Sequence, residues 1–188
     1  KSTRMGFGAG VGGDHATVAT ESPLFTNEEI RVVIDADGLN WLARQENWWE
    51  RMPAGRLILT PHIGEMSRLT EREAGEILED PQAIAAAYAK TWGQTVVIKA
   101  GYSVASDGKE TIVADDAPPS LASAGTGDVY AGMVGALVAQ GLAPLDAAGL
   151  AFYLGAQAAR TAEAIFGELG VIATDLPDVV ATELRQLS

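Results

Sequence analysis

The sequence predicts an α/β domain in which helices cover a mainly parallel β-sheet. Short β-branched runs alternate with stretches of helical periodicity, and parallel strands joined by crossover helices produce this order. The chain has 188 residues, which suits one domain, and 47% of them are hydrophobic, which is typical of a globular protein. We therefore expect a single domain built around one sheet.

Three short apolar runs predict the clearest buried strands. They are Arg31–Asp35, Arg56–Thr60 and Thr95–Lys99. Each run ends at a polar residue followed by a loop with glycine or proline, and this carboxyl end of a parallel strand is where open α/β folds bind ligands. Residues 102–105 and 111–114 flank Asp107-Gly108, a hairpin signal that predicts two antiparallel strands.

Helical patterns lie between these strands. Residues 36–52 read as one helix with Leu39, Leu42 and Trp41 facing inward, while the Trp48-Trp49 pair is either an interface patch or the cover of a core edge. Residues 70–73 match a capping box, and Asp80-Pro81 matches an N-cap followed by proline at the first helical position. We therefore expect two helices before the strand at 95–99.

The second half of the chain is read as helical. Residues 129–166 are apolar but are interrupted by Pro144, Asp146 and Arg160, so they predict two buried helices and not a membrane span. Thr174 or Asp175 starts a last amphipathic helix that runs toward Leu187.

The chain opens on the glycine-rich loop "GFGAGVGG", and no convincing strand precedes it. Without that strand the loop does not meet the dinucleotide-binding fingerprint. The opening residues also lack the apolar core of a secretory signal. We expect that an αβ unit leading into this loop is absent from the chain.

The charge balance limits the partners of the protein. With 13 Lys and Arg against 25 Asp and Glu, the formal charge is −12, which disfavours nucleic-acid binding. Any bound phosphate must therefore be held locally. The absence of cysteine excludes disulfides and a thiolate nucleophile and permits a reducing compartment, so we expect a cytoplasmic protein with no membrane contact.

The segment "SAGTGDVYAG" is the first candidate for chemistry. Gly125 and Gly127 allow successive N–H groups at a helix N-terminus to form an anion site without Lys or Arg. The carboxylate of Asp128 would repel an anion bound at such a site, so its presence there needs an explanation. A general base that accepts a hydroxyl proton during phosphoryl transfer would provide one. The alternative is an ordinary glycine turn with Asp128 as an exposed cap.

Other candidates follow the predicted strands. Lys99 is placed to meet a phosphate oxygen, or it simply reaches solvent. His62 could bind substrate or transfer a proton, or it is hydrogen-bonded at the surface, and with Glu65 alone it makes an improbable metal site. Asp35 and Asp37 could hold Mg²⁺ through water, although a helix cap is the safer interpretation of Asp37.

Several segments together resemble the ADP- or ATP-dependent (S)-NAD(P)H-hydrate dehydratases, a branch of the ribokinase-like superfamily. They are "GAGVG", "VIDADGLN", "LTPHIGEMSRL", "VIKAGYS", "ASAGTGDVYAG" and "GVIATDLPDVV". Other ribokinase-like kinases share the GTGD turn but lack the TPH-GE loop beside DADGLN, so the combination is specific. The resemblance runs from about Gly6 to the end of the chain and implies a three-layer α/β/α fold.

The resemblance also implies a reaction and a set of site residues. ADP or ATP, with Mg²⁺, would phosphorylate the ring hydroxyl of the hydrate of NADH or NADPH, and loss of phosphate would restore the reduced nicotinamide. Asp128 would be the base and contact the substrate. The anion hole would be Gly125, Thr126 and Gly127, the nucleotide site Lys99, Ala100, Gly101, Tyr102, Ser103 and Gly127, and the hydrate site His62 with Gly10 or Gly12. No residue is implied as a metal ligand, and a homo-oligomer, such as a tetramer, is expected.

The sequence departs from the family pattern at several points. Ala9 and Ile63 stand where the family has proline, and Ser103 stands where it commonly has threonine. Nothing matches the family's strands and helices before the glycine loop, so we expect residues 1–188 to form one ribokinase-like domain that is incomplete at its N-terminus. The alternatives are a small-molecule kinase acting on a thiazole or pyrimidine alcohol, and a truncated paralogue that binds nucleotide without turnover.

Overall fold

The computed structural model describes residues 5–8 and 30–186, and in this part of the chain six strands form one sheet in the order of the sequence. They are β1 (Met5–Gly8), β2 (Arg31–Ile34), β3 (Leu57–Leu59), β4 (Thr95–Lys99), β5 (Ser103–Ser106) and β6 (Thr111–Ala114). The first four strands are parallel, and the hairpin β5–β6 continues the sheet in antiparallel pairing. The strands predicted at 31–35, 56–60 and 95–99 and the hairpin are confirmed.

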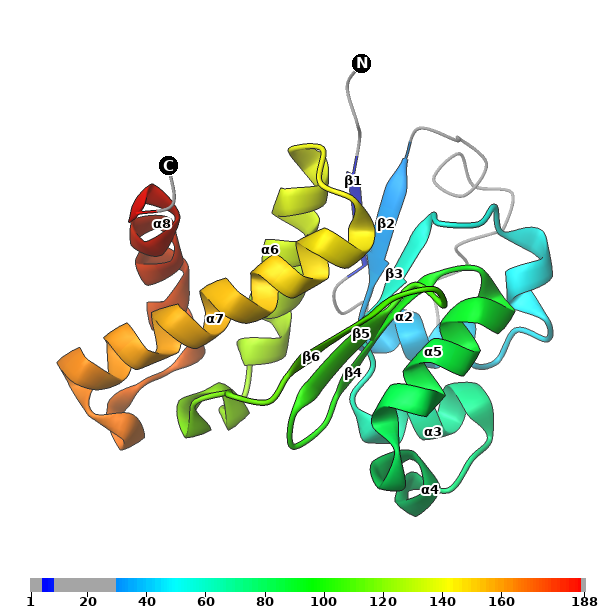
Figure 1. The fold of residues 1–188 in the computed structure, drawn as a ribbon, viewed down its shortest axis with the longest axis horizontal. Coiled ribbons are helices and arrows are strands. Elements are labelled where there is room, and N and C mark those ends of the chain that lie inside the picture. The colour runs from blue at the N-terminus through cyan, green and yellow to red at the C-terminus, as the bar shows by residue number, and fades with distance from the viewer. Residues whose placement is uncertain (1–4, 9–29, 187–188) are drawn as a thin grey trace.

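Helices cover both faces of the sheet (Figure 1), which confirms the three-layer α/β/α architecture. One face carries α2 (Asp37–Leu42), α3 (Ile63–Thr70), α4 (Ala74–Glu79) and α5 (Pro81–Trp92), and the other carries α6 (Thr126–Ala139) and α7 (Pro144–Phe166), with α8 (Leu176–Gln186) packed on α7. Neighbouring strand residues alternate between the two layers: Val33 packs with α6 and α7, whereas Val32 and Ile34 pack with α2 and α3.

β1 includes the first three residues of the segment interpreted as a glycine-rich loop, so the expectation that this segment begins as a loop was wrong. β1 pairs with β2 in parallel register from Met5–Arg31 to Gly8–Ile34. In this four-residue segment every second residue is glycine, which is unfavourable in a strand, so the local sequence predicts a strand only weakly, and its extended conformation follows from backbone pairing with β2.

The helix predicted over residues 36–52 is shorter than expected. α2 ends at Leu42, a turn follows, and Asn47 takes a left-handed conformation with φ 46° before the 3₁₀ helix η1 (Trp48–Arg51). This break turns Trp48 into the core, where its ring lies 5.2 Å from that of Trp92. Leu39 and Leu42 are buried as predicted and Trp41 is partly buried, and the two tryptophans cover a core edge.

Three helices lie between β3 and β4 instead of two, and the capping box predicted at Thr70 is wrong. Thr70 is the last residue of α3, and Glu71 ends that helix in a left-handed conformation. The capping box of this region lies at the other end of α3, between His62 and Glu65. The predicted cap at Asp80 is confirmed, since its Oδ1 accepts from the Ala83 N–H at 2.9 Å.

The remaining helices follow the prediction closely. The apolar region forms α6 and α7, and Pro144 is the first residue of α7. The last helix begins at Leu176, after the 3₁₀ turn η4 (Ala173–Asp175). None of the helices in the described part of the chain combines the length and hydropathy that crossing a bilayer would need.

Candidate active site

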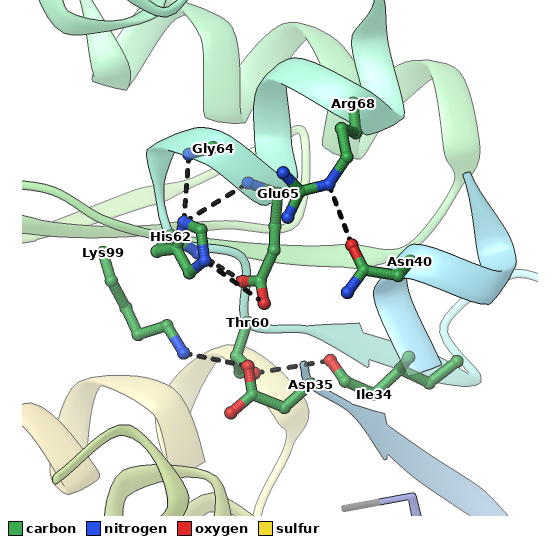
Figure 2. Close-up of polar contacts among 9 residues, drawn as sticks. All are labelled: Ile34, Asp35, Asn40, Thr60, His62, Gly64, Glu65, Arg68 and Lys99. Atoms are coloured by element: carbon green, nitrogen blue, oxygen red, sulfur yellow. Dashed lines mark hydrogen bonds and ion pairs between the residues drawn. The ribbon is translucent and has the colours of Figure 1, made fainter. Parts of the chain in front are cut away.

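The carboxyl ends of β2, β3 and β4 bring several predicted site residues to one edge of the sheet. The Thr60 N–H donates to the Ile34 carbonyl at 3.1 Å, and the Lys99 N–H donates to the Pro61 carbonyl at 2.9 Å. His62 and Lys99 consequently form an isolated parallel bridge. Figure 2 shows Asp35, His62, Glu65 and Lys99 grouped at this edge.

Lys99 points into this group of residues. Its Nζ donates to Asp35 Oδ1 at 2.8 Å, and the two side chains are 24% and 8% exposed. A Cβ atom on Gly127 would lie 3.3 Å from the same Nζ, so the ammonium group also faces the first turn of α6. The alternative in which Lys99 reaches solvent therefore does not describe this side chain. The carboxylate of Asp35, a candidate for Mg²⁺ binding, is paired with Lys99.

The cap assigned to Asp37 was wrong. The N-cap residue of α2 is Ala36, which has φ 48°, and no side chain caps the helix. Asp37 is the first residue of the helix. Its negative charge interacts favourably with the positive end of the helix dipole, but its carboxylate accepts no capping hydrogen bond. The positive φ of Ala36, which directs the chain into α2, could not be predicted from the sequence, because alanine rarely adopts this conformation.

The "SAGTGD" segment forms the turn that begins α6. Gly125 has φ 89° and is the N-cap residue, a conformation that favours glycine. The Thr126 hydroxyl donates to the carbonyls of Leu121 and Ser123 at 2.7 and 2.8 Å and thereby holds the turn in place. Asp128 lies in the first turn of α6 with its side chain exposed, so it is accessible to a ligand.

A cleft of about 300 Å³ opens between this turn, the start of the hairpin and helix α7. Six predicted residues line it: Lys99, Ala100, Gly101, Ser103, Thr126 and Gly127. His62, Tyr102, Gly125 and Asp128 do not line it, and the predicted Gly10 and Gly12 lie outside the described residues.

The far wall of the cleft was missed by sequence reasoning. It is built mainly from apolar side chains of α6 and α7, among them Met133 and Phe152, with Gly155 and Ala156 providing room. The small residues of α7 were interpreted as helix packing, and Gly155 does face Met133, whose Cε lies 3.4 Å from an ideal Cβ position. Only the crossing of α6 and α7 shows that these residues also line a cavity.

Tyr130 forms part of the same wall. Its hydroxyl donates to the Ala148 carbonyl at 3.2 Å, and its ring stacks on Phe152 with centroids 5.0 Å apart. Burial raises the pKa of Tyr130 well above its usual value of 10.0, because the tyrosinate anion would be desolvated. Tyr130 therefore stays neutral at physiological pH.

His62 is the N-cap of α3. Its Nδ1 accepts from the backbone N–H groups of Gly64 at 3.0 Å and Glu65 at 3.3 Å. One oxygen of the Glu65 carboxylate accepts a hydrogen bond from the His62 backbone N–H at 2.8 Å, which completes the capping box. The other oxygen lies 3.5 Å from His62 Nε2 (Figure 2). His62 is thus hydrogen-bonded at the surface, with 54% of its side chain exposed, and it belongs to no metal cluster among the described residues.

The site fits a phosphate-bearing ligand better than a metal held by protein alone. Within residues 5–8 and 30–186, no three His, Asp or Glu side chains converge on one point. Lys99 instead offers one ammonium group beside an open cleft and next to the first turn of α6. In that turn the N–H groups of Thr126 and Asp128 already donate to nearby backbone carbonyls. The pair with Asp35 neutralises part of the ammonium charge.

A sequence model described as NAD(P)H-hydrate dehydratase matches residues 5–181. The bifunctional NAD(P)H-hydrate repair enzyme Nnr of Moorella thermoacetica is 37% identical over 185 residues, which is 97% of this chain and 34% of that protein. The ADP-dependent (S)-NAD(P)H-hydrate dehydratase of Neisseria meningitidis is 34% identical over 184 residues, 96% of this chain and 61% of that protein. The chain therefore spans about a third of the bifunctional relative and less than two thirds of the dehydratase.

Solved structures give the same fold. The ADP/ATP-dependent NAD(P)H-hydrate dehydratase from Bacillus subtilis, co-crystallised with ATP and Mg²⁺, superposes with a TM-score of 0.74 at 24% identity, over 85% of this chain and 56% of that one. A ribokinase-like superfamily protein from Enterococcus faecalis superposes with a TM-score of 0.72 at 18% identity, over 85% and 54% of the two chains. The fold is therefore ribokinase-like.

Proposed function

The chain belongs to the NAD(P)H-hydrate dehydratase family, and on this basis we propose that it dehydrates the (S)-hydrate of NADH or NADPH at the expense of ADP or ATP. The product is the reduced dinucleotide, so the reaction repairs a damaged cofactor. The enzyme would then be a hydro-lyase that acts on a small molecule, with no role for nucleic acid.

The observation that carries this proposal is the position of Lys99 against Gly127. An ammonium group, a helix N-terminus and a glycine without a Cβ meet at the mouth of a cleft, and this combination suits a nucleotide phosphate. Lys99, Gly101, Ser103 and Gly127 would contact the nucleotide along the cleft. Tyr102 would support this segment from outside the lining.

Asp128 acts as the general base in this proposal. It takes the proton from the ring hydroxyl of the hydrate while the hydroxyl oxygen bonds to the terminal phosphorus of the nucleotide and the bridging P–O bond breaks. The ring then loses phosphate from one carbon and a proton from the neighbouring carbon. This elimination forms the missing double bond. The balance is loss of one water from the hydrate and hydrolysis of one phosphoanhydride.

The residues at the turn accept the charge of the transferring group. Gly125, Thr126 and Gly127, at the N-terminus of α6, would face the phosphoryl oxygens and stabilise their negative charge. Mg²⁺ bound together with the nucleotide would neutralise phosphate charge, and this ion commonly binds through phosphates and water with few protein ligands. His62 would hold the hydrate, together with Gly10 or Gly12.

The deciding experiment follows two signals at once. The protein is mixed with NADH hydrate, Mg²⁺ and either ADP or ATP, and the return of reduced-nicotinamide absorbance is recorded with the release of phosphate. Both signals should rise together with the preferred nucleotide. A stable phosphorylated product without free phosphate would instead identify a small-molecule kinase.

A negative result needs one further arm. If nucleotide binds and neither signal rises, the experiment is repeated with a protein that includes any in-frame coding sequence found upstream in the gene. If neither protein restores nicotinamide absorbance or releases phosphate, a nucleotide-binding paralogue is the better interpretation. This outcome would overturn the proposal.

Self-association and location belong to the same proposal. Ile165, Phe166, Leu169 and Ile172 are more than half exposed near the end of α7, an apolar cluster that supports a homo-oligomer such as a tetramer. Light scattering at several protein concentrations tests this point. We place the enzyme in the cytoplasm, since a chain without cysteine is compatible with a reducing compartment.

A further inference from the structure

The hydrogen bonds of His62 define which of its ring nitrogens carries the proton. Nδ1 accepts from two backbone N–H groups, those of Gly64 and Glu65, at 3.0 and 3.3 Å. A nitrogen that accepts these bonds holds no proton, and a neutral imidazole has one donor and one acceptor nitrogen. The proton of neutral His62 is therefore assigned to Nε2 from the hydrogen-bond network.

Glu65 restrains the other side of the same residue. Its side chain is 6% exposed, one carboxylate oxygen accepts from the His62 backbone N–H at 2.8 Å, and the other lies 3.5 Å from Nε2. A negative charge next to Nε2 favours the tautomer with the proton on that nitrogen. The contact is long, and the His62 side chain is 54% exposed, so the Nε2–H keeps the capacity to donate to a ligand.

We propose that Glu65 is a positioning residue that, together with the N-terminus of α3, holds His62 as an Nε2–H donor for an oxygen atom of the hydrate. This inference rests on the proposed function and names the role of His62 within it. A histidine held in this form donates a hydrogen bond to the substrate and does not accept the hydroxyl proton through Nε2. The proton of the ring hydroxyl then goes to Asp128.

The position of this donor suits the proposed reaction. His62 lies beside Lys99 on the carboxyl edge of the sheet, through the bridge between β4 and the segment after β3. A substrate held by His62 would therefore lie next to the ammonium group that faces α6. Without the Glu65 side chain, the half-exposed imidazole would be held only by the two bonds that its Nδ1 accepts from backbone N–H groups.

The first test is a tautomer measurement on the full chain, and it needs no enzymatic activity. The protein has two histidines, so ¹⁵N-histidine labelling gives few signals, and a His15→Gln variant assigns those of His62. We expect an unprotonated Nδ1 and a protonated Nε2 in the ¹H–¹⁵N correlation pattern. A protonated Nδ1, or signals averaged over both tautomers, would overturn the inference.

The second test separates positioning from helix capping. In Glu65→Ala we expect the His62 signals to move toward the average of the two tautomers and the KM for hydrate to rise roughly fivefold to tenfold, with kcat changed by less than about twofold. Glu65→Gln should keep the helix cap, because its amide oxygen still accepts from the His62 N–H, but it should not restore the tautomer or the KM, because its uncharged NH2 group then faces Nε2–H as a second donor. Glu79→Gln, an exposed carboxylate on α4, is the matched control and should change neither.

The outcomes distinguish this inference from the proposed function. A purely structural role of Glu65 would lower the melting temperature and leave the His62 signals of the folded protein unchanged, and that result overturns the inference. If the tautomer results are as expected but no dehydration occurs in any variant, the proposed function fails while the positioning of His62 by Glu65 stands. Normal hydrate KM in an active Glu65→Ala enzyme contradicts the inference directly.

Discussion

Lys99 and Asp35 stand 64 residues apart in the chain and meet at the carboxyl edge of the sheet, with Nζ 2.8 Å from Oδ1. The pair couples the end of β4 to the residue that follows β2, and both side chains are largely buried. Because the Lys99 ammonium also faces Gly127, the pair fixes the charge that a nucleotide phosphate would meet at the start of α6.

Removal of this ammonium should affect both binding and stability. In Lys99→Ala we expect nucleotide affinity to fall about tenfold, since one charge-assisted hydrogen bond to phosphate is lost. The same change leaves the Asp35 carboxylate buried without its partner, which should lower the free energy of unfolding by about 1–3 kcal/mol. Calorimetric titration with ADP or ATP and urea denaturation measure the two effects.

Two further variants separate these effects. Lys99→Ala combined with Asp35→Asn should regain part of the stability without regaining nucleotide affinity, because the unpaired charge is gone. Lys109→Ala removes an exposed lysine from the hairpin turn and should leave both quantities unchanged. Unchanged nucleotide affinity in Lys99→Ala would remove Lys99 from the proposed nucleotide site.

Replacement of the proposed base should abolish turnover and spare binding. Asp128→Asn keeps the shape of the side chain but cannot accept a proton, so we expect the rate to fall by about 10²–10⁴-fold with nucleotide affinity retained. Asp146→Asn is the matched control, an exposed carboxylate in the first turn of α7. Turnover of Asp128→Asn near the unmutated rate would exclude Asp128 as the base.

A methyl group on Gly127 should weaken nucleotide binding without weakening the fold. Its Cβ would lie 3.3 Å from Lys99 Nζ, so the ammonium must shift, while the φ of Gly127 lies outside the left-handed region and causes no strain. Alanine is the better helix former by up to about 1 kcal/mol, so we expect Gly127→Ala to unfold at the same or a slightly higher urea concentration.

The control for this prediction is Gly75→Ala. Gly75 is also the second residue of a helix, α4, and nothing lies within 4 Å of its ideal Cβ position. It should share the effect on stability and leave nucleotide affinity unchanged. Equal nucleotide affinity in the two variants would contradict the proposed role of the α6 N-terminus.

Tyr130 should make stability depend on pH in the alkaline range. Its pKa is raised in the folded state by burial, so its contribution is fully present below its unfolded pKa of about 10 and is lost as pH rises above that value. The expected slope is about 1.4 kcal/mol per pH unit for one proton released on unfolding.

The variant that reveals this dependence is Tyr130→Phe. Below pH 10 it should be less stable by about 0.5–1.5 kcal/mol, because the hydrogen bond to the Ala148 carbonyl is lost. Above pH 10 the difference from the unmutated protein should shrink. Urea midpoints between pH 8 and pH 11 measure this, with the half-exposed Tyr153→Phe as control; a constant difference would mean that Tyr130 does not titrate as described.

Elements with a strong local pattern could be predicted from the sequence. The runs at 31–35, 56–60 and 95–99 became β2, β3 and β4 because continuous apolar residues suit a sheet covered on both faces. Asp80-Pro81 marked the start of α5, and Asp107-Gly108 marked the hairpin turn. The glycine turn before Asp128 was also readable, because Gly125 needs a backbone conformation that few residues accept.

The family resemblance added what these patterns lack. It grouped Lys99, Gly101 and Ser103 of one motif with Gly127 of another, and in the structure these residues line one cleft. It did not suggest Met133 or Phe152, although both line the cleft. In a sequence, an apolar residue that lines a cavity cannot be distinguished from one that packs in the core.

The tertiary structure alone decided the features that depend on distant contacts. β1 exists because its backbone pairs with β2, and α2 ends early because Trp48 turns to meet Trp92. Buried Gln94 holds the start of β3, its Oε1 accepting from the N–H groups of Arg56 and Leu57 at 2.9 and 2.7 Å.

The same division holds at the candidate site. The sequence by itself determined which chemical groups end the strands and begin α6, because strand patterns and glycine turns are local properties of the chain. It did not determine that Lys99 pairs with Asp35 or that Glu65 restrains His62. Those contacts depend on how strands and helices pack, and the free energy of packing is distributed over residues far apart in the sequence.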